Sequence, residues 1–119
     1  MNILFIGDIV GSPGRRAMKE LLPTMLKEYD VDVCIANAEN SAAGMGISQK
    51  IAISLFDTGV DIITLGNHSF ARVDYLRFAD AESRIVRPAN VSDSWPGHDY
   101  AVVDVKDKGR LMVINLVGR

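Results

Sequence analysis

The fold of this chain is constrained most strongly by three short apolar runs. Each run is followed by a polar motif that contains glycine or asparagine, and then by a helical pattern. The runs cover residues 3–6, 31–36 and 62–65, and the motifs are GDIVGSPG (7–14), NAEN (37–40) and GNHS (66–69). Strands that alternate with helices at this spacing are typical of βαβ units, in which the strands are parallel and the crossovers right-handed. We therefore expect an α/β fold that begins β-α-β-α-β-α.

The first helix is predicted to begin at Ser12 and Pro13, because serine caps a helix N-terminus and proline suits the first turn. Its core face is expected to consist of Leu21, Leu22, Met25 and Leu26. Pro23 lies inside this pattern, and a proline within a helix removes a hydrogen bond and clashes with the preceding turn. A kink or a break is therefore expected there.

The remaining elements are marked by capping and turn residues. A second helix is predicted between Ser48, a capping residue, and Gly59, which suits a helix C-terminus. A third, shorter helix is expected over residues 73–79. Residues 100–105 and 111–116 flank an Asp-Lys-Gly turn and predict a β-hairpin.

Composition excludes several classes of protein. The net charge of −2 is spread along the 119 residues, so an extended nucleic-acid groove is not expected. Cys34 is the only cysteine, which rules out a disulfide within the chain and fits a reducing, cytoplasmic setting. No apolar run approaches the length of a membrane span. Arg15 and Arg16 are interpreted as part of a solvated helix face, with steering of an anionic substrate as the alternative.

Side chains that can bind metals follow all three apolar runs. In an open α/β sheet, the loops that leave the carboxyl ends of parallel strands meet at one edge, where ligands bind. The side chains expected to meet there are Asp8, Glu39, Asn40, Asn67 and His68. Carboxylate, amide and imidazole ligands suit a pair of divalent first-row metal ions.

The chemistry expected at this edge is phosphoryl transfer assisted by two metal ions. Glu39 is the candidate to bridge the ions, with Asp8 completing the shell of one and Asn67 that of the other. His68 can donate a proton to a leaving alkoxide or hydrogen-bond a phosphate oxygen. Taken singly, Asp8 and Asn40 are also common turn residues, so the hypothesis depends on the combination of motifs.

The motifs together resemble a known family. GNH after a strand is typical of calcineurin-like metallophosphoesterases, and GDIVGSPGR, NAENxAxGxGI, GNHSF, RPAN (87–90) and INLVGR (114–119) resemble the YmdB-like bacterial phosphodiesterases. The resemblance implies that Asp8, Glu39, Asn40 and Asn67 are metal ligands and that His68 is catalytic. It also implies two divalent ions, with iron or manganese preferred over magnesium or zinc, and hydrolysis of phosphodiesters such as 2′,3′-cyclic nucleotides.

The resemblance further implies that residues 1–119 are the βαβαβ half of an αββα sandwich with a C-terminal β-hairpin, and so an incomplete, truncated domain. Members of the family are longer, and their second half supplies three more histidine ligands. This chain has only His68 and His98, and His98 is expected in an exposed turn. Catalysis by the short chain alone is therefore in question.

Three alternatives remain open at this point. The chain is the N-terminal half of a phosphodiesterase, or a short module that binds a metal ion or nucleotide, or interacts with a partner, without turnover. The third is a flavodoxin-like fold with phosphate at the first loop, which leaves NAEN and GNH unexplained. Because half of a two-sheet sandwich exposes apolar sheet surface, we expect a homo-oligomer or association with a separate C-terminal half.

Overall fold

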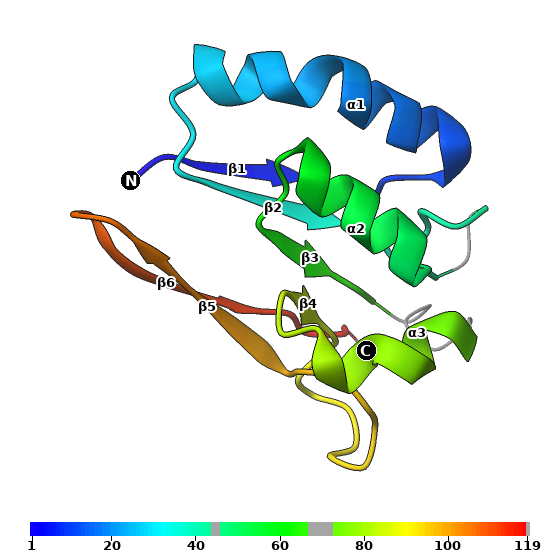
Figure 1. The fold of residues 1–119 in the computed structure, drawn as a ribbon. Helices are drawn as coiled ribbons and strands as arrows, with labels where there is room; N and C mark the ends of the chain where they lie inside the picture. Colours follow the sequence, from blue (N-terminus) through cyan, green and yellow to red (C-terminus); the bar gives the residue numbers. More distant parts are fainter. Residues whose placement is uncertain (44–45, 67–72, 119) are drawn as a thin grey trace.

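The computed structural model describes residues 1–43, 46–66 and 73–118, which form three layers (Figure 1). The middle layer is a parallel sheet in the order β1 (Ile3–Ile6), β2 (Val33–Asn37), β3 (Ile62–Thr64) and β4 (Ile85–Val86). Helices α1 (Gly11–Glu28), α2 (Gln49–Thr58) and α3 (Val73–Phe78) pack on one face, and the 3-10 turn η1 (Ala79–Ala81) follows α3. The antiparallel hairpin of β5 (Tyr100–Val105) and β6 (Gly109–Ile114) crosses the other face. The expected α/β class and the C-terminal hairpin are confirmed.

Helix α1 begins one residue earlier than predicted. Its N-cap is Val10, and no side chain caps the helix, so the prediction that Ser12 is the cap is wrong. The backbone N–H of Gly11 instead donates to the carbonyl oxygen of Asn40 at 3.0 Å. The neighbouring loop thus satisfies one of the free N–H groups at the helix start, a task that usually falls to a cap.

Helix α1 also continues through Pro23, so the predicted break is absent. Pro23 and Lys19, whose carbonyl group loses its N–H partner, are both exposed residues, so the proline falls on the solvent side of the helix. The predicted core face is partly wrong. Leu22 is buried as expected, but Leu21 is 58% exposed, and Met18, one turn before Leu22, is buried instead.

The second and third helices agree with the predictions. The Ser48 hydroxyl oxygen accepts a hydrogen bond from the Ile51 N–H at 3.2 Å, and Gly59 ends α2 at φ 127°, where other residues are strained. Helix α3 ends at Phe78 and η1 continues the turn. Among the helices of the described residues, none is long and apolar enough to cross a membrane.

Strand β4 and the role of His98 were not foreseen. Two residues are too few to show a strand periodicity, and only pairing with β3 defines β4. His98 forms a parallel bridge with Val86, and its carbonyl oxygen accepts a hydrogen bond from the Arg87 N–H at 2.9 Å. A ring nitrogen of His98 lies 2.9 Å from the carbonyl oxygen of Asp80. His98 is therefore a half-buried structural residue, and the expected exposed turn is wrong.

Each face of the sheet has its own core, because successive side chains of a strand point to opposite faces. On the helix side the core includes Met18, Leu22, Cys34, Ile63, Leu65, Tyr75 and Ile85. On the hairpin side it consists of Val33, Ile35, Ile62, Val86, Ala101 and Val113. Strands β2 and β3 are buried on both faces, which explains their continuous apolar runs.

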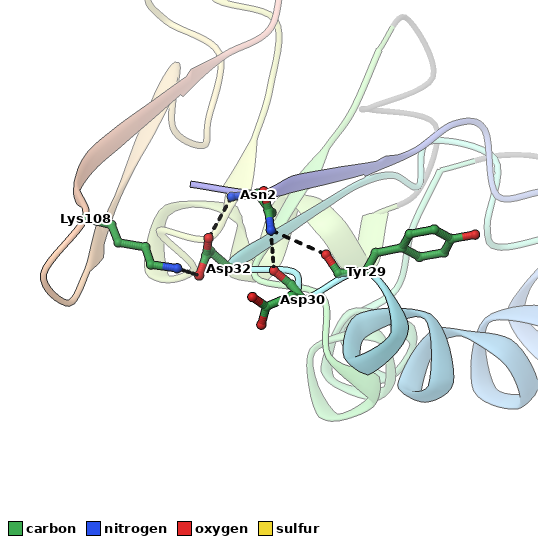
Figure 2. A network of polar contacts seen from close by, with 5 residues as sticks. All are labelled: Asn2, Tyr29, Asp30, Asp32 and Lys108. Atoms are coloured by element: carbon green, nitrogen blue, oxygen red, sulfur yellow. Dashed lines mark hydrogen bonds and ion pairs between the residues drawn. The ribbon is translucent and has the colours of Figure 1, made fainter.

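A polar network ties the hairpin to the amino-terminal end of the sheet (Figure 2). The two carboxylate oxygens of Asp32 accept from the Lys108 ammonium group at 2.8 Å and from the Asn2 backbone N–H at 2.6 Å. The Asn2 side chain donates to the carbonyl oxygens of Asp30 and Tyr29 at the end of α1. The hydrogen bond with Lys108 holds the pKa of Asp32 below its usual value. The hairpin turn is thus fixed at the end of the sheet opposite the candidate site.

Candidate functional site at the carboxyl edge of the sheet

The first two predicted loops lie side by side at the carboxyl edge of the sheet. The Ile9 N–H donates to the carbonyl oxygen of Asn37, and the Gly11 N–H donates to that of Asn40, each at 3.0 Å. These two bonds extend the pairing of β1 with β2 beyond the strands themselves. The loops that carry Asp8 and Glu39 are therefore held together by backbone contacts, whatever their side chains do.

Strand β3 ends at the same edge, with Gly66 just beyond it. The Ala38 N–H donates to the carbonyl oxygen of Thr64 at 3.0 Å, which extends the pairing of β2 with β3. A Cβ atom added to Gly66 would overlap both carboxylate oxygens of Glu39. Glycine at position 66 therefore allows the Glu39 carboxylate to lie against the backbone at the end of β3.

Asp8 and Asn40 are joined directly. The amide nitrogen of Asn40 donates to a carboxylate oxygen of Asp8 at 2.7 Å, although the residues are 32 positions apart. Asp8 is exposed and Asn40 is half-buried, so the pair faces the outside of this edge. The structure thus brings Asp8, Asn40 and Glu39 to one edge. The other two predicted site residues, Asn67 and His68, lie outside the described residues.

The side chain of Asn37, at the end of β2, contacts the Glu39 carboxylate. Its amide nitrogen lies 3.4 Å from a Glu39 carboxylate oxygen and 3.5 Å from the Thr64 hydroxyl oxygen. Its amide oxygen is buried and, within residues 1–43, 46–66 and 73–118, has no hydrogen-bond partner. An unsatisfied buried acceptor is costly, so this oxygen marks a position where a donor or a cation belongs.

The side chains at this edge are of the chemical types that bind a divalent cation. Two carboxylates and two amides supply the oxygen ligands that hard cations prefer. The described ranges do not complete a shell, because they contain no group of three His, Cys, Asp or Glu side chains that could hold a metal ion. Further ligands would have to come from Asn67, from His68 or from outside this chain.

The two C-terminal motifs RPAN and INLVGR pack against each other behind this edge, which sequence reasoning did not foresee. The Asn115 amide nitrogen donates to the carbonyl oxygen of Leu65, and its carbonyl oxygen accepts from the Ala89 N–H at 2.8 Å. The Asn90 side chain makes two hydrogen bonds to the backbone of Val117, at 2.7 and 2.8 Å. Asn115 therefore holds the chain that follows β3, and Asn90 joins the two motifs to each other. Their only sequence signal was membership of the two motifs.

Arg87 is a second residue that sequence reasoning did not single out. It follows β4, is only 5% exposed, and donates from its guanidinium to the carbonyl oxygen of Pro88 at 2.9 Å. Its Nε has no hydrogen-bond partner among the described residues. Burial raises the pKa of the nearby Tyr75 to about 12, and the charge of Arg87 partly opposes that rise. A buried donor without a partner is costly, so the Nε of Arg87 marks a position where an acceptor belongs.

Comparisons with known proteins identify relatives of this chain. A Bacillus subtilis (strain 168) protein named 2′,3′-cyclic-nucleotide 2′-phosphodiesterase is 44% identical over 119 residues, which are 100% of this chain and 45% of that protein. A Mycoplasma pneumoniae protein named putative phosphatase/phosphodiesterase is 32% identical over 121 residues, covering 99% of this chain and 43% of its own length. The chain thus spans less than half the length of these relatives.

Solved structures show the same fold. The crystal structure of a hypothetical protein from Thermus thermophilus matches with a TM-score of 0.91 and 34% identity, over 100% of this chain and 46% of that one. The crystal structure of a novel phosphatase from Mycoplasma pneumoniae matches with a TM-score of 0.89 and 32% identity, over 98% of this chain and 42% of that one. The sequence model of the YmdB-like protein family matches residues 4–119. The chain therefore belongs to the YmdB-like protein family.

Proposed function

We propose that this chain is the N-terminal half of a metal-dependent phosphodiesterase that acts on phosphodiesters such as 2′,3′-cyclic nucleotides in the cytoplasm. The observation that carries the proposal is the meeting of two loops and the end of β3 at one edge, where Asp8 contacts Asn40 and Glu39 lies against Gly66. The names of the related proteins support the same class of reaction.

Asp8, Glu39, Asn40 and Asn67 are the residues that would hold two divalent ions, with iron or manganese preferred over magnesium or zinc. When bound, such ions polarise a phosphoryl oxygen and lower the pKa of a water molecule toward neutrality. Asn37 holds the Glu39 carboxylate in place, and Asp8 fixes the orientation of the Asn40 amide. His68 would give a proton to the leaving oxygen as its bond to phosphorus breaks.

The remaining ligands are assigned to a C-terminal half supplied by a longer polypeptide or a second chain. The described residues alone leave the shell incomplete, and the chain covers under half of its relatives. Ile3 and Phe5 on the hairpin side of β1 are about half-exposed and offer a surface for that half or for a second copy. Apolar surface of this kind usually marks association sites.

The proposal is tested by measuring hydrolysis of bis-para-nitrophenyl phosphate and 2′,3′-cyclic AMP with added manganese. The 119-residue chain alone is expected to show negligible turnover, and addition of the C-terminal half in trans is expected to restore it. Tight nucleotide or metal binding without turnover, unchanged by the other half, would instead support a binding module. Vigorous turnover by the chain alone would contradict the proposal that residues 1–119 supply only part of the active site.

Variants of the completed enzyme separate the roles of the residues. His68→Ala is expected to lower turnover by about 10²–10⁴-fold with metal content nearly unchanged, because a proton donor is not a ligand. Glu39→Ala is expected to empty the site. Gly66→Ala tests the supporting geometry, since its new methyl group displaces the Glu39 carboxylate. Equal loss of metal in the His68 and Glu39 variants would refute the role of His68.

A further inference from the structure

A surface pocket of about 570 Å³ lies between α1 and α2, and none of the proposed metal ligands lines it. It is lined by Ser12, Arg15, Arg16 and Lys19 of α1 and by Ser48, Lys50, Ile51 and Ser54 at α2. Four of these side chains are cationic, three carry hydroxyl groups, and none is a carboxylate. The pocket thus concentrates positive charge in a chain whose net charge is −2.

The cations of this pocket are not neutralised by neighbouring acids. In the described part of the chain, the ion pairs involve Arg84, Lys108 and Arg110, and none involves a cation of the pocket. Arg16, Lys19 and Lys50 are exposed and make no hydrogen bond to another described side chain. These three side chains are therefore available to an anionic ligand, although Asp57 lines an adjoining pocket with Lys19 and Lys50.

The placement of these cations opposes local helix preferences. Neither α1 nor α2 has an acidic residue in its first turn, although the positive end of the helix dipole favours one. Lys50 instead stands in the first turn of α2. Arg15 and Lys19 are four residues apart on α1, a spacing at which like charges repel. Local conflicts without an evident structural gain are expected at functional positions.

One wall of the pocket is held rigidly. The Arg15 guanidinium donates to the carbonyl oxygen of Ser41 at 2.8 Å, so Arg15 is fixed against the loop that follows NAEN. The Ser48 hydroxyl oxygen accepts from the Ile51 N–H at the start of α2. A hydroxyl group can accept and donate at once, so its own proton remains available as a donor toward the pocket.

We propose that this pocket binds the di- or triphosphate group of an anionic ligand, through residues other than the proposed metal ligands. Four cations match the charge of a polyphosphate chain better than that of one phosphate or carboxylate. Arginine favours phosphate because its planar guanidinium can form two parallel hydrogen bonds to phosphate oxygens. The volume is within the range of small-molecule sites, so a group attached to the phosphates also fits.

The test is titration of the 119-residue chain with tripolyphosphate in low-salt, EDTA-containing buffer, followed by calorimetry and by backbone amide chemical shifts. Saturable binding is expected, with the largest shifts around residues 48–54. Arg16→Gln and Lys50→Gln are each expected to weaken binding at least about tenfold, as loss of a charge-assisted contact does. Lys27→Gln, at the far end of α1, is the matched control and is expected to leave affinity unchanged.

Parallel titrations with ATP and AMP identify the source of the phosphates. ATP binding equal to or tighter than tripolyphosphate, with AMP much weaker, indicates a nucleotide polyphosphate, whereas weaker ATP binding indicates a free polyphosphate. The proposal is overturned by equal weakening in the Lys27 variant, by shifts centred on residues 8–11 and 37–41, or by no saturation. Both substitutions are on exposed helix positions, and the amide spectrum of each variant confirms that it is folded. Because metal is absent, failure here leaves the hydrolytic proposal standing.

Discussion

The two faces of the central sheet differ in how completely they are closed. On the helix side, Leu4 and Ile6 of the edge strand β1 pack against a core that runs across all four strands. On the hairpin side, the core covers β2 to β4 only, and Ile3 and Phe5 remain 48% and 58% exposed. The helix layer therefore finishes its side of the sheet, while a two-stranded hairpin is too narrow to finish the other.

The hairpin itself repeats this asymmetry. Ala101 and Val113 are paired, face the sheet and are buried. The next pair along the hairpin, Val102 and Met112, faces outward and is exposed. Strand residues alternate between faces, so an apolar outer row signals a further layer. This chain therefore covers one face of its sheet completely and leaves part of the other face exposed.

The largest effect is expected from a large-to-small change on the closed face. Ile63 is fully buried in β3, so Ile63→Ala should lower the free energy of unfolding by about 2–5 kcal/mol. Ile3→Ala, on the open face, is the matched control and should cost well under half as much. Urea denaturation measures the difference, provided that the unfolding free energy of both variants falls with urea at the same slope. Equal losses would refute the contrast between the faces.

The next effect concerns the pH dependence of the closed face. Burial raises the pKa of the Cys34 thiol to about 11, and the charge of Asp61 raises it further in the same direction. Between about pH 9 and pH 11 the unfolded thiol loses its proton while the folded thiol keeps it, so stability falls as pH rises. The loss is expected to reach about 2 kcal/mol.

Cys34→Ala provides the reference for this effect, because it removes the thiol and keeps every other alkaline titration. The stability advantage of the unmodified chain over the variant should be constant below about pH 8 and shrink toward about pH 11. Urea midpoints of both proteins at several pH values measure it. An advantage that stays constant throughout this range would show that the thiol is not protected by burial.

A smaller effect on stability, but a specific effect on association, is expected on the open face. Phe5→Ser should change the free energy of unfolding of the monomer by less than about 1 kcal/mol, because the ring is already largely in water. It should weaken self-association or binding of the C-terminal half. Leu21→Ser, at an equally exposed residue of the helix layer, is the control. Sedimentation and binding assays in which both variants behave alike would remove the open face as an association surface.

The smallest effect is expected where the hairpin turn meets the sheet. The pKa of Asp32 is lowered mainly by its hydrogen bond with Lys108, so its contribution is present above about pH 4 and is lost as pH falls through the lowered value. Asp32→Asn should lower the thermal midpoint slightly at about pH 7 and not at about pH 2. Added salt should reduce the difference, since the pair is near the surface. An undiminished difference in acid would show that the charge of the Asp32 carboxylate is not the cause of the effect.

Local signals predicted most of the elements. The first three strands were visible because buried parallel strands are apolar on both faces, and α2 was bounded by Ser48 and Gly59 because a cap and a positive φ each require few residue types. The failures were equally physical. Strand β4 is defined only by its neighbour, and Leu21 is exposed because the core that meets α1 accepts Met18 in its place.

The sequence by itself determined the order of the first three strands and of the helices, and it determined the hairpin. It also determined the edge at which Asp8, Glu39 and Asn40 meet, because parallel topology forces successive loops to one side of a sheet. Only the tertiary structure decided the contacts within and around that edge. Glu39 against Gly66, Asn115 beneath Leu65 and the buried Arg87 depend on segments far apart in the chain or on burial by several elements. Periodicity and capping act over one turn of helix or along a short stretch of strand, so they carry no information about such contacts.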